Sequence, residues 1–189
     1  LPRIVANIAA GIDLRAAANA APLDIIICEN LLDADKFLRG LLEQTVKPET
    51  RDYLDNKVGL VEASIGRMVP VMTDEMREGN ALRVWVEPYE ELPVDKDAFR
   101  GEIPPIKTLV PFSPFGFYIR RKLFIHNMGH ALCAYFGWLK GYTYIYEAAE
   151  DKEIVSRAQS AMLSVAAALH REYGIPLSEI EANVYDLIH

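Results

Sequence analysis

The 189-residue chain has only two cysteines, no strongly basic stretch and no long apolar run. Its net charge of −7 argues against a nucleic-acid partner, because no basic stripe is present to neutralise phosphates. No apolar run approaches the roughly 20 residues that cross a bilayer, and no signal peptide opens the sequence. Cys28 and Cys133 lack the spacing of a metal site, so we predict buried free thiols in a reducing compartment. These features favour a cytoplasmic globular protein without a membrane partner.

Two further absences concern the extent of the chain. The tripeptide G-x-G does not occur, so the glycine-rich dinucleotide fingerprint is missing. There is also no initiator methionine, since Leu1 leads directly into structured sequence, and the last predicted helix simply stops at the final residues. We therefore expect a fragment.

Strands and helices alternate in the first part of the chain. The run Leu23–Cys28 predicts a buried parallel strand, Val58–Glu62 a second short strand, and the alternating run Leu82–Pro88 a half-exposed strand. Residues 68–80 look irregular. Helical patterns are predicted over residues 2–19, over 34–45 with Asp33 as the N-cap, and from Pro48 onward. This order predicts an α/β fold.

The second part of the chain is predicted to be all-α. Residues 101–114 are rich in proline and glycine and are interpreted as a linker or crossover. Helical periodicity follows over residues 116–139, 143–173 and 176–188, with Gly141 and Gly174 at the breaks.

The strongest chemical signal is a polar set inside one apolar helix, formed by Lys122, Asn127 and His130. At about 100° per residue they lie at about 0°, 140° and 80° of one arc, so all three can point into the same space. Each of them alone has a structural explanation. The lysine can extend its ammonium to solvent, the asparagine can bond a neighbouring backbone group, and the histidine can be hydrogen-bonded within the core. Burying all three among leucine, phenylalanine and isoleucine costs free energy unless they are hydrogen-bonded or serve a function. Together they therefore indicate a catalytic site. His126 shares the arc at about 40° and is interpreted as wall or packing.

The spacing K-x4-N-x2-H from Lys122 to His130 resembles that of the mannitol dehydrogenase family, the polyol-specific long-chain dehydrogenases. Three further stretches are similar to family segments in the same order. They are Asp24–Asn30, Val58–Pro70 and Ala134–Gly141.

The resemblance implies a Rossmann-type domain followed by a helical domain, with the active site between them. We therefore predict an α/β remnant of a Rossmann-type domain in residues 1–110 and the first part of an all-α C-terminal domain in 111–189. The glycine-rich loop would lie upstream, so the fragment alone is expected to be inactive. It is also expected to associate with itself through bare sheet edges and apolar faces.

The resemblance also implies hydride transfer between NAD and a polyol or sugar phosphate without a metal, with mannitol 1-phosphate and fructose 6-phosphate expected first. Lys122 would be the general base, and its partial burial should lower its pKa toward neutrality. Asn30 and Asn127 would donate hydrogen bonds to the developing alkoxide, and His130 would hold a substrate hydroxyl. Asn30, just beyond a strand's carboxyl end, is also the candidate cofactor contact.

Departures from the family pattern affect the proton path and the substrate. The family often has aspartate where Gly66 stands, and an acidic residue where Arg120 stands. Binding of a substrate phosphate would need basic side chains, for which Arg120, Arg121 and Lys140 are available.

Three alternatives stay open. The first is another activity of the same family, mannitol 2-dehydrogenase or a hexuronate (fructuronate or tagaturonate) reductase. The second is a non-catalytic helical interaction domain. The third is a metal site at His126 and His130, which lacks the glutamate of H-E-x-x-H and a clear third ligand. We therefore expect no metal.

Overall fold

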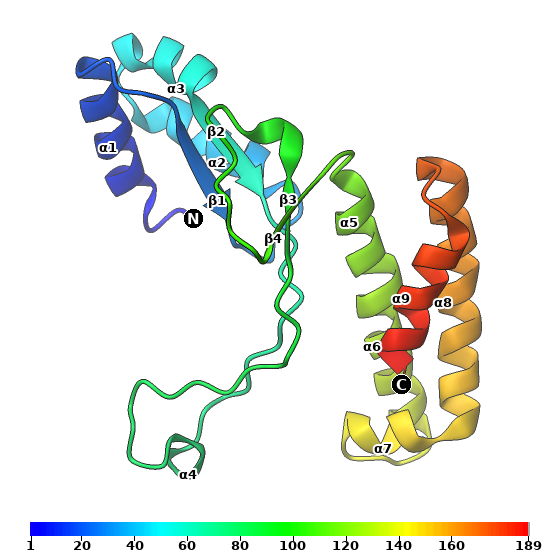
Figure 1. The fold of residues 1–189 in the computed structure, drawn as a ribbon. Helices are drawn as coiled ribbons and strands as arrows, with labels where there is room; N and C mark the ends of the chain where they lie inside the picture. The colour runs from blue at the N-terminus through cyan, green and yellow to red at the C-terminus, as the bar shows by residue number, and fades with distance from the viewer. Residues whose placement is uncertain (189) are drawn as a thin grey trace. The chain divides into compact units, whose positions relative to one another are not determined.

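The computed structural model describes residues 1–188 and divides into two compact units, Leu1–Phe115 and a helical unit from Gly116 onward (Figure 1). The division falls a few residues after the predicted boundary at residue 110, and that boundary stays a prediction. The elements of the N-terminal unit are α1 (Val5–Ala17), β1 (Leu23–Ile27), α2 (Ala34–Thr45), η1 (Pro48–Thr50), α3 (Arg51–Lys57), β2 (Val58–Glu62), α4 (Asp74–Arg77), β3 (Leu92–Asp95), η2 (Lys96–Ala98) and β4 (Leu109–Phe112).

Strands β1 and β2 form a parallel pair whose register runs from Leu23 opposite Val58 to Ile27 opposite Glu62. Successive side chains of a strand point to opposite faces, and here both faces are covered. Ile27 on one face packs with the α1 and α2 side chains, whereas Val61 on the other packs with β3 and β4. This two-sided packing explains why both strands are mainly apolar, and the parallel pairing agrees with the prediction for Leu23–Cys28.

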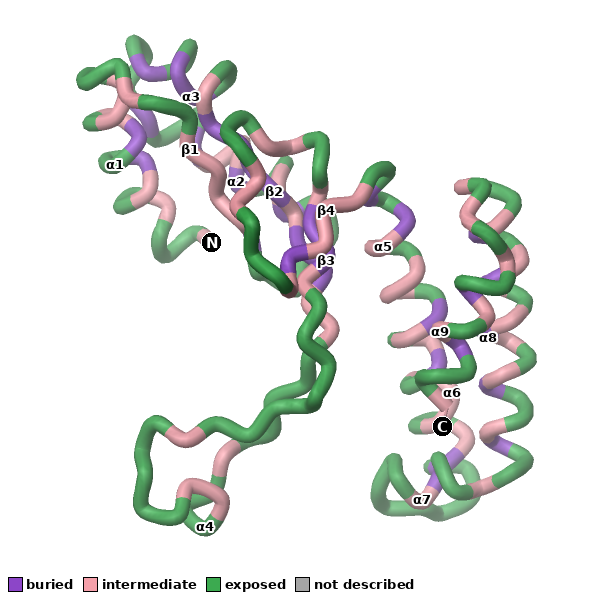
Figure 2. Tube along the Cα trace, in the orientation of Figure 1, coloured by how far each residue is buried: buried purple, intermediate pink, exposed green. Residues whose placement is uncertain are grey.

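Helices α1 and α2 cover the first of these faces. Ile12, Leu38 and Leu42 are fully buried there, and the spacing of the last two places them one turn apart on α2. Figure 2 shows buried stretches along α2 and β2, whereas the long connection that carries α4 between β2 and β3 is mostly exposed. Helix α2 begins directly after Asp33, as predicted, but the Asp33 side chain does not cap it. Instead the carboxylate binds the Lys36 ammonium at 2.6 Å.

Three sequence predictions are wrong, two for this unit and one for the cysteines of both units. Residues 82–88 are not a strand, and within them Val84, Trp85 and Val86 are about half exposed. The further strands are β3 and β4, a second parallel pair, and β4 lies inside the segment interpreted as a linker. Cys28 is exposed and Cys133 only half-buried, so neither thiol is fully buried, although both are free.

The second unit is helical over its described residues, as the periodicity predicts. Its elements are α5 (Gly116–Arg121), η3 (Lys122–Asn127), α6 (Met128–Leu139), α7 (Ile145–Glu150), α8 (Lys152–Tyr173) and α9 (Leu177–Ile188). The predicted breaks at Gly141 and Gly174 are confirmed, and both glycines have positive φ (83° and 70°), which a residue with a Cβ rarely adopts.

Helix α8 is the packing centre of this unit and contacts α5, α6, α7 and α9. Its buried side chains recur at helical spacing: Ile154, Ala158, Met162, Ala166 and Leu169. Asp151 caps its start by accepting the amide hydrogens of Glu153 and Ile154. Among residues 1–188, no helix is both long and apolar enough to cross a membrane.

Candidate functional site

Three of the four predicted catalytic residues, Lys122, Asn127 and His130, lie on or beside a π-helical turn. Residues Lys122–Asn127 form η3, a six-residue π segment between the α-helical segments α5 and α6. The predicted angular positions assume α-helical turns, so they do not hold across this segment. π-Helical turns inside α-helices are uncommon and occur frequently at functional sites. The turn begins at Lys122 and ends at Asn127, two of the three candidate residues.

Lys122 is half-buried at the start of this turn. Burial lowers the pKa of its ammonium, because removal from water disfavours the charged form. The segment around it is apolar: Phe117, five positions earlier, is buried, and Ile125 within the π segment is fully buried. The direction of the shift is the one that a general base working near neutral pH requires. Asn127 and His130 are exposed, which differs from the buried polar set expected from the apolar helix.

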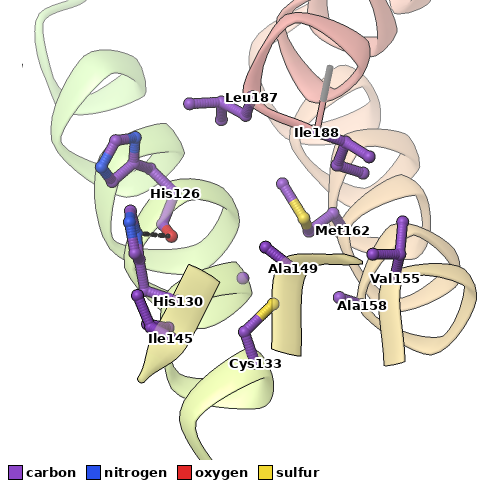
Figure 3. Close-up of a pocket in the computed structure, with 11 residues that line it drawn as sticks. His126, His130, Cys133, Ile145, Ala149, Val155, Ala158, Met162, Leu187 and Ile188 are labelled. Carbon is purple, nitrogen blue, oxygen red and sulfur yellow. Dashed lines mark hydrogen bonds between the residues drawn. The ribbon is translucent and has the colours of Figure 1, made fainter. Parts of the chain in front are cut away.

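A groove of about 150 Å³ opens beside η3 and α6 (Figure 3). His126 and His130 form one wall, and Met162, Leu187 and Ile188 come from α8 and α9. Lys122 and Asn127 are not among its lining residues, so this groove brings together only part of the predicted set.

The two imidazoles of the groove are close neighbours, with ring centres 4.7 Å apart. Nδ1 of His130 lies 3.1 Å from the backbone carbonyl oxygen of His126. A carbonyl oxygen only accepts, so Nδ1 is the protonated nitrogen and donates this hydrogen bond. In neutral His130 the other nitrogen, Nε2, is then an acceptor that can receive a hydroxyl hydrogen.

The basic side chains considered for a substrate phosphate all have partners within the protein. Arg120 pairs with Glu172 at 2.6 Å, and the guanidinium of Arg121 lies 4.5 Å from the ring centre of Tyr118. Lys140 pairs with Asp151 and Glu153 at 2.9 and 2.8 Å, which raises its pKa to about 12. These contacts leave phosphate binding by any of the three without support.

Asn30 lies in the exposed connection Cys28–Asp33, which follows the carboxyl end of β1. This placement agrees with the prediction, because ligands of open α/β sheets bind outside the carboxyl ends of parallel strands. Asn30 belongs to the N-terminal unit, and η3 to the helical one.

The sequence analysis missed Glu62, the last residue of β2. Its Oε1 accepts the amide hydrogen of Ala34, the first residue of α2, at 2.8 Å. A carboxylate at the last position of a buried strand was the signal that could have indicated this contact, since that edge of a parallel pair faces the β1–α2 connection.

The part of the chain that the structure describes contains no group of three His, Cys, Asp or Glu side chains arranged to hold a metal ion. The third ligand that a site at His126 and His130 would need is therefore not supplied by these residues.

The fold defines the class: an α/β unit of the Rossmann type with parallel strand pairs, followed by a helical unit. The family model of the mannitol dehydrogenase Rossmann domain matches residues 1–108, and that of the mannitol dehydrogenase C-terminal domain matches 116–188. The chain therefore belongs to the mannitol dehydrogenase family, and the predicted family and fold class are confirmed.

Individual relatives agree with this assignment. The chain is 36% identical over 174 residues to a mannitol-1-phosphate 5-dehydrogenase of Oceanobacillus iheyensis, covering 92% of this chain and 44% of that protein. It thus spans less than half the length of this relative.

Two solved structures share the fold. A substrate-free D-sorbitol dehydrogenase superposes on 100% of this chain and 40% of its own, with a TM-score of 0.82 and 18% identity. The mannitol 2-dehydrogenase of Pseudomonas fluorescens, solved with NAD and D-mannitol, covers 96% of this chain and 39% of its own, with a TM-score of 0.72 and 22% identity. At these identities the likeness establishes the fold alone.

Proposed function

We propose that this chain carries catalytic residues of an NAD-dependent polyol dehydrogenase that interconverts mannitol 1-phosphate and fructose 6-phosphate. The observation that carries the proposal is Lys122, a half-buried lysine with a lowered pKa at the first position of a π-helical turn. Family membership and the similarity to a mannitol-1-phosphate 5-dehydrogenase support the substrate class.

Lys122 takes the proton of a substrate hydroxyl as hydride passes to NAD from the carbon that bears this hydroxyl. In the reductive direction the ammonium of Lys122 returns that proton. Its lowered pKa supports this role, because the neutral amine is then present at a lower pH than in an exposed lysine. Asn30 and Asn127 donate hydrogen bonds to the oxygen that develops negative charge. His130, whose Nε2 is the acceptor, holds a substrate hydroxyl. No metal takes part in this scheme.

NAD supplies the hydride acceptor when bound, and the residues of this chain are suited to contact only part of it. The carboxyl ends of β1 and β2, with Asn30 beyond β1, form the edge where nucleotides bind in parallel sheets. The first amide of α2 is already taken by Glu62, so this helix start does not offer that donor to a pyrophosphate. We propose that the pyrophosphate contacts come from residues outside this sequence, and that the chain alone is inactive.

The test is NAD reduction by the full-length polypeptide with D-mannitol 1-phosphate and D-mannitol offered in parallel. Turnover of the phosphate with little turnover of mannitol is expected. Turnover of mannitol alone would favour mannitol 2-dehydrogenase, and reduction of fructuronate or tagaturonate with NADH would favour a hexuronate reductase. Inactivity with all of them would contradict the proposal and favour a non-catalytic helical domain.

We also propose a cytoplasmic location, consistent with the free thiols of Cys28 and Cys133. Self-association of the isolated chain is proposed because large apolar side chains are exposed, among them Val71, Leu82 and Trp138 at 92%, 89% and 76%. A monomer in light scattering at high concentration would contradict it.

A further inference from the structure

Glu62 lies beside both ends of the connection that carries Asn30. Its backbone lies opposite Ile27, the last residue of β1, in the parallel register. Its side chain reaches the other end of the connection, where Oε1 accepts the amide hydrogen of Ala34 at 2.8 Å. The intervening residues Cys28–Asp33 are exposed and belong to neither β1 nor α2. One residue of β2 therefore lies beside the start of this connection and accepts a hydrogen bond from its end.

The start of α2 depends on this contact from outside the helix. Asp33, at the N-cap position, has φ of 52° and makes no side-chain hydrogen bond to the helix amides. The left-handed conformation is unfavourable for a residue with a Cβ and persists only where the surroundings hold it. The first amides of a helix lack partners within the helix, so the Glu62 carboxylate supplies what the N-cap residue does not.

The charge of Glu62 is not explained by stability. Burial raises the pKa of its carboxyl, and the nearby charge of Asp35 raises it further. A raised pKa means that the ionised carboxylate is disfavoured in the folded chain, so its charge costs folding free energy above that pKa. A neutral glutamine would keep an acceptor for the Ala34 amide without this cost.

We propose that Glu62 is a positioning residue for the reaction: it holds the Cys28–Asp33 connection so that Asn30 is placed to bond the reacting oxygen. The proposal rests on the function proposed above, in which Asn30 is a hydrogen-bond donor. Glu62 itself touches neither substrate nor cofactor in this scheme. Its effect passes through the backbone of the connection, where small displacements of a donor have large effects on rate.

The experiment compares Glu62→Ala, Glu62→Gln and a matched control in the full-length polypeptide. The control is Asp13→Ala, because Asp13 Oδ1 accepts the amide hydrogen of Lys47 at 3.1 Å. This contact is of the same kind and in the same unit, but it ties the connection that leads from α2 toward α3. The readouts are kcat and KM at a temperature where all variants are folded, and hydrogen exchange of the amides from Cys28 to Ala34.

We expect Glu62→Ala to lower kcat by about tenfold to a hundredfold and to speed amide exchange between Cys28 and Ala34. Glu62→Gln should restore most of both, and Asp13→Ala should change neither beyond its effect on melting temperature. Unchanged exchange or unchanged kcat in Glu62→Ala, with an active wild type, would overturn the positioning role alone. An inactive wild type would instead overturn the proposed function, while the exchange measurement would still decide whether Glu62 holds the connection.

Discussion

Replacement of Gly59 by alanine should strongly destabilise the N-terminal unit. A Cβ at this position of β2 would lie 2.1 Å from Asp24 Oδ1 and 2.7 Å from the backbone carbonyl oxygen of Ala98. The Asp24 carboxylate cannot simply turn away, because it accepts the amide hydrogens of Arg100 at 2.7 Å and Gly101 at 3.0 Å. The methyl group must therefore displace either a held carboxylate or a backbone segment.

The magnitude follows from these contacts. Overpacking of a filled site costs about 1–3 kcal/mol, and weakening the bonds to a charged acceptor costs about 1.5–3 kcal/mol. The reduced freedom of the unfolded chain returns about 0.4–1 kcal/mol, so the net loss should be about 2–5 kcal/mol.

Urea unfolding followed by circular dichroism measures this loss. The matched control is Gly40→Ala on α2, where a Cβ meets nothing within 4 Å and alanine should stabilise by about 0.5–1 kcal/mol. In an Asp24→Ala background, Gly59→Ala should cost less, because one of the two clashes has been removed. A Gly59→Ala variant within about 0.5 kcal/mol of the wild type would refute the reasoning.

Two further predictions concern the helical unit. Gly137→Ala should lower the melting temperature, because its Cβ would lie 2.8 Å from the Cβ of the buried Ala148. The control is Gly11→Ala, whose Cβ meets nothing within 4 Å and which should not lower it. Equal melting temperatures for Gly137→Ala and the wild type would contradict the close packing. The pair of Lys140 and Asp151, with pKa values of about 12 and about 2, should contribute stability that is lost as pH falls toward 2 or rises toward 12. In Asp151→Asn, the melting temperature should fall less than in the wild type as the pH is lowered toward 2. An equal fall in both proteins would count against the pair.

The sequence predicted the strands whose apolar runs are continuous and missed those interrupted by proline. Strands β1 and β2 were found because apolar side chains predominate in them and pack on both of their faces. Strands β3 and β4 contain Pro93 and Pro111, which are typical of loops and strand edges, so their segments were not assigned as strands. The predicted strand at 82–88 has an alternating pattern, but its apolar side chains Val84 and Val86 stay about half exposed. Pattern alone does not reveal whether a partner strand exists.

The sequence predicted which residues belong to the candidate site, but not how they are arranged in space. The spacing from Lys122 to His130 correctly indicated the family, and the burial of Lys122 gives its pKa the expected direction. The π-helical turn could not be predicted, because counting 100° per residue presupposes α-helical bonding. The proposed role of Glu62 depends on the register of β1 against β2, a contact between segments distant in sequence.

The most direct test of the account is the pH dependence of polyol oxidation in the full-length polypeptide, compared for wild type, Lys122→Ala and Lys122→Arg. In wild type, kcat should rise with pH around a midpoint below the ordinary lysine value of about 10.4, because the lowered pKa releases the base earlier. Both variants should lose about 10²- to 10⁴-fold in kcat and the pH-dependent rise, while NAD affinity stays nearly unchanged, since arginine keeps the charge but cannot act as a base. Turnover near the wild-type level in either variant, with the same pH profile, would contradict the role of Lys122.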